Sequence, residues 1–412
     1  MRVLLIADWM PRPGGSETYV LAVRDGLRAA GDDVRVLASS AGTAVDGTAD
    51  YVAYGTTHPV PQVLLQIVNP SALRTLGTAL REHRPDVVFV TLFMYHLSAA
   101  LLGRLRGVPT VLSVLDYKYI CPLGSKLLPE GHRCTEPAGV ACLRHHCVSI
   151  PHWLRDLPRY ALVRSAMRQV DRVLACSRWV QRELEANGIS AEHLPLPVPT
   201  PVPSFARHPA PEPLFVYCGR LAAEKGVALL LRAFARVHRE LPSARLRIVG
   251  EGPERGVLER LAGELGLESA VTFREWVPAA AVERELADAW ALVTPSLWAE
   301  PLGLAAREAI VRGVPVVASR DGGLGESVEE GVTGLVFPNG DQSALAERLE
   351  AVARGRAFPE HMLSQSNVSR ARASWDLHRH GEALRRVFED VVARRRGTMR
   401  ARPNVAAGSA PP

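Results

Sequence analysis

The amino-acid sequence predicts an α/β protein built from two doubly wound parallel-sheet domains. Its 412 residues are too many for one compact core and suit two domains of ordinary size. In each half, short apolar runs alternate with helical patterns, which is typical of β-α-β units. A proline-rich segment separates the halves. Hydrophobic residues make up 47% and charged residues 22%, as in ordinary globular chains, so extensive disorder is not expected.

Five runs rich in valine and leucine predict the strands of the first half, at residues 3–7, 34–38, 87–90, 109–115 and 172–175. Between the first two runs, apolar residues keep helical spacing. We expect Ser16 to be the N-cap of this helix and Gly31 to mark its end. Strand, helix and strand in this order imply a parallel sheet that is covered on both faces.

The same pattern restarts at residue 214. Strands are predicted at 214–218, 246–249, 271–273, 291–295 and 314–319, with helical segments such as 227–240 between them. Prolines between the two halves are too dense for a helix or a central strand, so we expect a semi-rigid linker there.

These patterns divide the chain into an N-terminal domain (1–195), a linker (196–213), a second domain (214–370), a C-terminal helix (371–399) and a disordered tail (400–412). The C-terminal helix is a candidate to pack back on the N-terminal domain. The strand ends of the two domains should face each other across a cleft, where ligands of such sheets bind.

The net charge is mildly positive, at +6 from 49 basic and 43 acidic residues. This balance suits an anionic substrate or an acidic membrane surface, and it is too small for a dedicated nucleic-acid binder. Only five apolar residues lie between Arg2 and Asp8, whereas a secretion signal needs roughly 7 to 15. We therefore expect a cytoplasmic protein whose six cysteines are thiols or metal ligands.

The glycine motifs disfavour two classes of nucleotide-binding protein. The first strand is not followed by G-x-G-x-x-G, and the sequence contains no G-x-x-x-x-G-K-[ST] loop, which argues against NAD enzymes and P-loop ATPases. Gly14 and Gly15 precede the first helix, where backbone N–H groups can approach an anion closely. Taken alone, this pair fits a plain strand-to-helix turn better.

A charged loop follows the first strand of the second domain. Arg220 and Lys225 project from it, between Gly219 and Gly226. A forked guanidinium and a compact ammonium would together clamp a diphosphate. The alternative is that both are solvated charges on a surface loop.

Two glutamates flank the start of a later helix. Pro301 suits the first turn of that helix, so the amides of Gly303 and Leu304 would face the cleft as an anion site. Glu300 stands at the helix mouth and Glu308 further along. Carboxylates that face a cleft accept hydrogen bonds from the hydroxyls of a ribose or sugar ring. The alternative is one capping carboxylate and one exposed carboxylate.

Together these motifs resemble the retaining glycosyltransferases of family 4, whose GT-B fold pairs two Rossmann-like domains. The resemblance covers nearly the whole chain, in order and at family spacing. Its motifs are Gly14-Gly15, Gly219-Arg220 with Lys225-Gly226, Gly250-Glu251-Gly252-Pro253, the E-x7-E pair of Glu300 and Glu308, and the segments 313–318 and 331–338.

The resemblance implies a nucleotide-diphosphate sugar as donor. Arg220 and Lys225 would neutralise its diphosphate, Glu300 would hold hydroxyls of the donor sugar, and Glu308 would bind the ribose. The amides of Gly303 and Leu304 would complete the phosphate cradle, closed by Gly14 and Gly15 from the N-terminal domain. The base would lie against Gly250 and the segment from Phe273 to Val277, and Gly219 is a further donor-binding residue. Glu275 stands where the family usually has a glycine.

A further segment, Asp116-Tyr117-Lys118, is similar to a family motif that reads His-Asp-Tyr-Lys. The resemblance therefore places Asp116 among the catalytic residues. The family histidine, which faces the donor sugar, is Leu115 in this chain. His96 is a candidate to take its place.

The resemblance implies transfer of a sugar, with retention of its anomeric configuration, to an acceptor hydroxyl of a cell-surface polysaccharide, a glycolipid or a natural-product glycoside. No cofactor or metal is expected to be required for catalysis. Two alternatives stay open: a GT-B-type nucleotide-sugar epimerase, and a catalytically silent homologue that binds the nucleotide sugar. Leu115 keeps the second alternative open.

Four cysteines cluster in a segment of low apolar content, at Cys121, Cys134, Cys142 and Cys147. Their intervals are not those of a paired C-x2-C zinc ribbon. They are either ligands of a structural zinc ion or unliganded thiols. Cys176 and Cys218 end strands and are expected to be buried core thiols.

Arginines recur at about helical spacing, at Arg155, Arg159, Arg164, Arg168 and Arg172. They predict either a helix that makes peripheral contact with the inner face of an anionic membrane or an ordinary amphipathic surface helix. The run 394–396 of three arginines is either a solvated end or a phosphate-seeking one.

Overall fold

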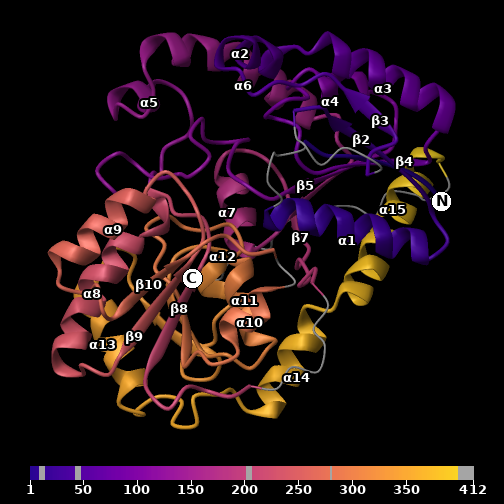
Figure 1. Ribbon diagram of the computed structural model, residues 1–412. Coiled ribbons are helices and arrows are strands. Elements are labelled where there is room, and N and C mark those ends of the chain that lie inside the picture. Colours follow the sequence, from indigo (N-terminus) through magenta and orange to yellow (C-terminus); the bar gives the residue numbers. More distant parts are fainter. Residues whose placement is uncertain (9–13, 42–47, 201–206, 279–280, 398–412) are drawn as a thin grey trace, which may run out of the picture.

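The structure is a computed structural model that describes residues 1–8, 14–41, 48–200, 207–278 and 281–397. It consists of two lobes, each built around a parallel sheet with helices on both sides (Figure 1). The predicted pair of doubly wound parallel sheets is confirmed. The predicted linker lies partly outside the described residues, at 201–206, and the predicted tail lies wholly outside them.

The first sheet contains seven strands: β1 (Arg2–Ile6), β2 (Asp33–Ser39), β3 (Tyr51–Ala53), β4 (Val87–Val90), β5 (Thr110–Val114), β6 (Arg172–Ala175) and β7 (Glu192–His193). Their order is β3-β2-β1-β4-β5-β6-β7. The chain turns outward in both directions from β1, so the switch point of the sheet lies between β1 and β4. β3 and β7 were not predicted because they have only three and two residues.

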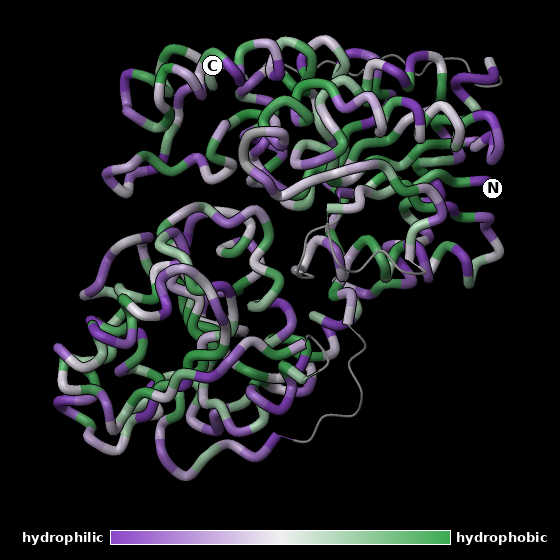
Figure 2. The backbone as a smooth tube through the Cα atoms, turned by 45° about the horizontal axis from the view of Figure 1, so that its top comes forward, coloured by the Kyte–Doolittle hydropathy of each residue, from purple (hydrophilic) through white to green (hydrophobic). Residues whose placement is uncertain are grey.

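The second sheet contains six strands: β8 (Leu214–Cys218), β9 (Arg245–Val249), β10 (Val271–Arg274), β11 (Ala291–Thr294), β12 (Val316–Ser319) and β13 (Gly334–Phe337). Their order is β10-β9-β8-β11-β12-β13, with the switch point between β8 and β11. The central strands are buried on both faces. Figure 2 shows hydrophobic segments running through the interior of each lobe.

The helices of the first lobe are α1 (Gly15–Ala29), α2 (Pro59–Ile67), α3 (Pro70–His83), α4 (Leu101–Arg104), α5 (Val140–Arg144), α6 (Ile150–Met167) and α7 (Arg178–Ala186). Those that follow are α8 (Val227–Glu240), α9 (Arg255–Glu264), α10 (Val282–Leu286), α11 (Leu304–Ile310), α12 (Gly323–Glu326), α13 (Gln342–Ala353), α14 (Gln365–Ser374) and α15 (Leu377–Arg395). A short 3-10 turn, Ala223–Lys225, precedes α8.

The predicted N-cap of the first helix is wrong. α1 begins at Gly15 with Gly14 as its N-cap, and Ser16 is already inside the helix. The buried carboxylate of Glu17 accepts a hydrogen bond of 2.8 Å from the Gly14 N–H group. Glu17 thus satisfies the N–H group of the N-cap residue, which is a different donor from the first-turn N–H groups that an N-cap serine hydroxyl would bond. Gly31, with φ of 85°, follows the end of the helix as predicted.

The last helix, α15, crosses back to the first lobe and packs beside α1 (Figure 1). Its buried side chains, such as Leu384 and Phe388, belong to the core of the first lobe, and the Phe388 ring lies 5.4 Å from the Phe89 ring. The three arginines at 394–396 are exposed, which agrees with the predicted solvated end. Each pairs with an aspartate, at Asp390, Asp171 and Asp86 respectively.

The α15 contact predicts a pH-dependent stability. Buried His380 donates from Nδ1 to the Pro195 carbonyl oxygen at 2.9 Å, and its Nε2 accepts from the Tyr19 hydroxyl at 3.0 Å. Burial lowers the pKa of His380 from 6.5 to about 4. The unfolded chain therefore takes up this proton at higher pH than the folded chain does. The stabilisation is complete above about pH 6.5 and is lost as the pH falls through 4, at a cost of about 3 kcal/mol.

The measurement is the free energy of unfolding by urea between pH 7 and pH 4. His380→Gln should flatten this dependence, because glutamine takes up no proton. His378→Gln is the control, because the His378 side chain is 84% exposed. Equal pH dependence in wild type and His380→Gln would contradict the assignment.

Candidate active site

The two lobes meet through loops at the carboxyl ends of their strands. The Tyr117 hydroxyl, after β5, donates to the Ala299 carbonyl oxygen at 2.7 Å. The Ser177 hydroxyl, after β6, donates to the Pro301 carbonyl oxygen at 2.7 Å. Residues 299–304 of the second lobe therefore form part of the contact with the first lobe.

This contact brings two predicted anion-binding elements together. A Cβ atom placed on Gly15 would stand only 2.8 Å from Leu304 Cδ2. The Gly14-Gly15 turn at the start of α1 therefore lies against the Gly303-Leu304 start of α11. Gly303, with φ of 74°, is the N-cap of α11. Pro301 thus lies before the helix, and its predicted place in the first turn is wrong.

Lys225 and Glu300 form an ion pair at this contact. Lys225 Nζ donates to Glu300 Oε1 at 2.7 Å, and the Ser296 hydroxyl donates to the same oxygen. Burial opposes ionisation of Glu300, but the charge of Lys225 and these hydrogen bonds outweigh it and lower the pKa below its usual value. Glu300 is therefore a carboxylate at neutral pH. The Lys225 ammonium also lies 5.3 Å from the centre of the Trp298 ring.

Arg220 is the more accessible of the two predicted diphosphate-binding cations. Its side chain is 63% exposed, and its guanidinium pairs with Glu224 from the following turn. Each cation of the predicted clamp is therefore held by a carboxylate of the protein.

The loop that carries Lys225 is locked to the loop that carries Glu300. The Leu297 N–H group donates to the Glu224 carbonyl oxygen at 2.9 Å. Gly226 has φ of 70°, and a Cβ atom there would stand 2.0 Å from the Pro295 carbonyl oxygen. Only glycine permits this approach of one backbone to the other.

Glu308 lies inside the second lobe, on α11. Glu308 is 9% exposed, and its Oε1 atom accepts a hydrogen bond from the Thr200 hydroxyl at 3.0 Å. Burial raises the pKa of Glu308, although the nearby charge of Arg312 and the Thr200 hydrogen bond oppose this. The alternative of an exposed surface carboxylate is therefore wrong.

The predicted base-contact residues lie at the ends of β8, β9 and β10. Gly250 and Gly219 are in backbone contact, since a Cβ atom on Gly250 would stand 1.9 Å from the Gly219 carbonyl oxygen. Phe273 is half-buried, with the Arg255 guanidinium 5.9 Å from the centre of its ring. Val277 packs on the core of the second lobe, and Glu275 is exposed.

Asp116 belongs to the first lobe, directly after β5. Its carboxylate accepts from the Tyr95 hydroxyl at 3.1 Å and from the Lys118 N–H group at 2.9 Å. Burial raises the pKa of Asp116. Leu115 is buried in the core of the first lobe.

Sequence reasoning missed Asp8, which organises the same edge of the sheet. This buried carboxylate accepts from the N–H groups of Tyr95, His96 and Leu97, at 2.6, 3.2 and 2.9 Å. Burial raises its pKa. The position of Asp8 directly after the first predicted strand, at the end where ligands of doubly wound sheets bind, is a signal that could have identified it. His96 itself is buried in the described structure, with no protein partner there for its Nδ1 atom.

The arginines of the predicted basic row do not share one face. Arg159 is buried and donates to the Met94 carbonyl oxygen at 3.1 Å, Arg155 pairs with Asp156, and Arg172 belongs to β6. None of the helices in the described part of the chain is long and apolar enough to traverse a bilayer.

The predicted zinc ligands Cys121, Cys134, Cys142 and Cys147 line one cavity between β5 and α6. Within the described ranges, no three or more candidate ligands already surround a point where a metal ion could sit. Of the two expected core thiols, Cys176 is buried and Cys218 is partly exposed.

Two family models together span most of the chain. The model described as "Glycosyl transferase 4-like domain" matches residues 14–199, and the model described as "Glycosyl transferases group 1" matches residues 203–367. The boundary between the two matches falls within the proline-rich segment.

Among curated proteins, the chain is 35% identical over 209 residues to the GDP-mannose-dependent alpha-(1-6)-phosphatidylinositol monomannoside mannosyltransferase of Mycolicibacterium smegmatis. This match covers 45% of the chain and 54% of the relative, so it spans about half of each protein.

Solved structures are similar over nearly the whole chain. Sucrose-phosphate synthase from Thermosynechococcus elongatus has a TM-score of 0.73 at 21% identity, covering 95% of this chain and 99% of that one. Anabaena HepE, solved with UDP, has a TM-score of 0.67 at 19% identity, covering 95% of this chain and 100% of that one. HepE has also been solved with UDP-glucose. At these identities the similarity establishes the fold.

The contact between Gly226 and Pro295 predicts that alanine at 226 is unusually costly. Gly331→Ala is the matched control, because Gly331 has φ of 73° and open space where a Cβ atom would lie. Gly331→Ala should cost about 1 kcal/mol for the left-handed conformation alone. Gly226→Ala should cost about 1–3 kcal/mol more, because the carbonyl oxygen of Pro295 must move. Urea unfolding of both variants measures the difference, and equal losses would contradict the steric argument.

Proposed function

We propose that this chain, which belongs to the GT-B glycosyltransferases of family 4, transfers a sugar from a nucleotide-diphosphate donor to an acceptor hydroxyl with retention of configuration. The observation that carries this proposal is the Lys225–Glu300 pair at the contact between the lobes. The two side chains lie 2.7 Å apart, so Lys225 would bind a phosphate next to the position where Glu300 would bind sugar hydroxyls. A neighbour in structure that binds UDP and UDP-glucose supports a nucleotide sugar as donor.

The donor diphosphate would exchange places with carboxylates that are already present. Lys225 is held by Glu300 and Arg220 by Glu224, so both cations are charged and positioned before the donor arrives. When the diphosphate takes these cations, Glu300 is released to accept hydrogen bonds from sugar hydroxyls. The cations and the amides at the start of α11 then stabilise the charge that develops as the sugar–phosphate bond breaks.

The acceptor hydroxyl is proposed to need no side chain of the protein as its base. In a retaining transfer from the same face, the departing phosphate oxygen is well placed to take the acceptor proton. The first lobe would present the acceptor near Asp116. The Tyr95 hydroxyl donates to Asp116, and the Tyr95 N–H group donates to Asp8. Leu115 leaves the position that faces the sugar without a polar group. We propose that the buried His96 supplies the polar group there.

Glu308 is proposed to bind the ribose of the donor, and this assignment can be tested directly. Glu308→Ala should weaken binding of the cognate nucleotide sugar by roughly 10- to 100-fold, since a hydrogen bond to a charged group contributes about 1.5–3 kcal/mol. The fold should persist, because the Thr200 hydroxyl is the side chain that bonds this carboxylate. Candidate donors are first screened by thermal shift, because a specific ligand raises the melting temperature.

Glu347→Ala is the matched control, because Glu347 is exposed on α13. Unchanged donor affinity in Glu308→Ala would remove the ribose assignment. Release of nucleoside diphosphate only when an acceptor is added supports the transferase. Interconversion of the sugar without release would support the epimerase instead, and binding without either reaction would support a silent homologue.

We also propose that the first half of α6 rests on an anionic membrane while the enzyme works. Ile150, Leu154 and Leu157 follow helical spacing on one face and are 64%, 55% and 44% exposed. Beside them a pocket of ≈ 250 Å³ is lined by Trp153, Leu157 and Arg164 among others. An exposed apolar stripe beside a tryptophan and an arginine suits the boundary between lipid headgroups and acyl chains.

Vesicle sedimentation tests the membrane proposal. Wild type should bind phosphatidylglycerol vesicles more strongly than phosphatidylcholine vesicles. The double variant Leu154→Ser, Leu157→Ser should bind roughly tenfold or more weakly, because each exposed leucine contributes about 1–2 kcal/mol when it is buried. Val257→Ser, which removes a 46% exposed side chain from α9, should bind as wild type does. Equal sedimentation of the double variant would refute the proposed surface.

A further inference from the structure

The segment between β5 and α6 has little regular structure to hold it. Residues 115–149 are all described, and they contain only the five-residue helix α5 and an isolated bridge between Leu127 and Arg133. Even so, Cys121, Lys126 and Cys142 within it are buried. Irregular segments with buried interiors are commonly held by a disulfide or a metal ion, since they lack an apolar core of their own.

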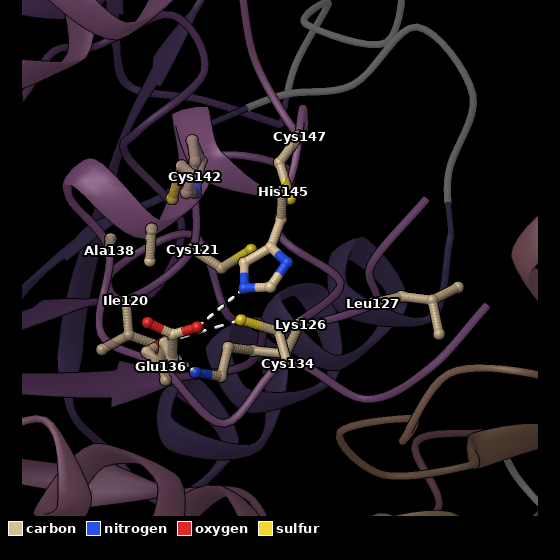
Figure 3. Close-up of a pocket in the computed structure, with 12 residues that line it drawn as sticks. Ile120, Cys121, Lys126, Leu127, Cys134, Glu136, Ala138, Cys142, His145 and Cys147 are labelled. Atoms are coloured by element: carbon tan, nitrogen blue, oxygen red, sulfur yellow. Dashed lines mark hydrogen bonds and ion pairs between the residues drawn. The ribbon is translucent and has the colours of Figure 1, made fainter. Parts of the chain in front are cut away.

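Four cysteines from separate parts of this segment line one cavity (Figure 3). Cys121 follows β5, Cys134 follows the bridge, Cys142 lies on α5 and Cys147 comes after it. All four are free thiols. The cavity measures ≈ 10 Å³, which is room for one ion or one water molecule and too small for an organic ligand.

The main chain already holds these cysteines in place. The N–H group of Cys121 donates to Tyr117, that of Cys134 to Lys126 and that of Cys147 to Cys142, at 2.8, 2.8 and 2.9 Å. The sulfur atoms do not yet converge, because no three candidate ligands in the described chain surround a common metal position. The Cys134 thiol instead donates to the Glu136 carbonyl oxygen at 3.7 Å, so this side chain would have to turn to bind a metal.

The charges around the cavity suit a cluster of thiolates. Lys126 is buried, lines the same cavity, and donates from Nζ to the Glu136 carbonyl oxygen at 2.8 Å. A buried ammonium group offsets negative charge on neighbouring sulfur atoms. His145 and Glu136, the other potential ligands in the cavity, are already bonded to each other, with His145 Nε2 2.7 Å from a Glu136 carboxylate oxygen.

We propose that Cys121, Cys134, Cys142 and Cys147 bind one Zn²⁺ ion. Four thiolates in a closed site are the usual environment of structural zinc, and sulfur ligands favour zinc over magnesium or calcium. Each thiol gives up its proton to solvent as it binds. His145 and Glu136 stay outside the ligand set and border the site.

The zinc ion would fix the segment that follows Asp116 and, through it, a contact with the second lobe. Arg133 pairs with Glu183 on α7 and lies over the Trp179 ring at 4.4 Å. The start of α7 in turn reaches the second lobe, where the Arg178 N–H group donates to the Glu326 carboxylate at 2.9 Å. This role is structural, and it does not depend on the reaction that the protein catalyses.

Metal analysis of the full-length wild-type chain, purified under reducing conditions without added metal, is the first test. We expect one zinc ion per chain. X-ray absorption should show four sulfur ligands at about 2.3 Å. Replacement of the zinc ion by Co²⁺ should give the intense visible absorption of tetrahedral thiolate coordination. Wild-type protein without stoichiometric zinc, with iron in its place, or with disulfides among these cysteines would overturn the proposal.

Variants test the ligand set. Cys134→Ser and Cys147→Ser should each reduce the zinc content below about one tenth of the wild-type value and expose residues 122–147 to proteolysis. Cys218→Ser controls for loss of a cysteine elsewhere, and His145→Gln controls for loss of the neighbouring imidazole. Both should retain one zinc ion. Loss of zinc in His145→Gln, or its retention in both cysteine variants, would overturn the four-cysteine assignment. If the cysteine variants do not fold, the wild-type metal and absorption data still decide.

Discussion

The contact made by residues 299–304 is the constraint on which the rest of the site depends. In a parallel sheet all carboxyl ends lie at one edge, so each lobe has a single edge where loops can gather functional groups. The hydroxyls of Tyr117 and Ser177 attach the edge of the first lobe to the carbonyl oxygens of Ala299 and Pro301. Glu300 lies between those two carbonyl groups in the chain, so the contact that joins the lobes also sets the position of the carboxylate.

Carboxylates of the protein already pair with the two cations and the backbone N–H group that would bind an anion. Lys225 is paired with Glu300, Arg220 with Glu224, and the Gly14 N–H group with Glu17. Such a site holds its cations in place without leaving a buried charge unpaired, which would be costly. A diphosphate would then replace existing partners and would not have to order the side chains afresh.

The first lobe depends on parts of the chain that lie far from its sheet in sequence. α15 returns from the second lobe to supply Leu384 and Phe388 to the core of the first, and its last arginines pair with Asp171 and Asp86. The core of the first lobe is therefore completed by a helix from the far end of the chain.

The sequence by itself determined the two parallel sheets, because buried parallel strands are continuous apolar runs that a local pattern reveals; β4, β6 and β8 have the predicted bounds. The charged loop and the Glu300–Glu308 spacing were equally visible. Only the tertiary structure decided how charges pair. Gly14 became the N-cap, with its N–H group bonded to Glu17. Arg159 became buried, and Arg395 and Arg396 paired with Asp171 and Asp86, which are distant in sequence. A charged residue gives the same sequence signal whether its side chain is solvated or pairs with a carboxylate. Its partner depends on the fold and not on its neighbours along the chain.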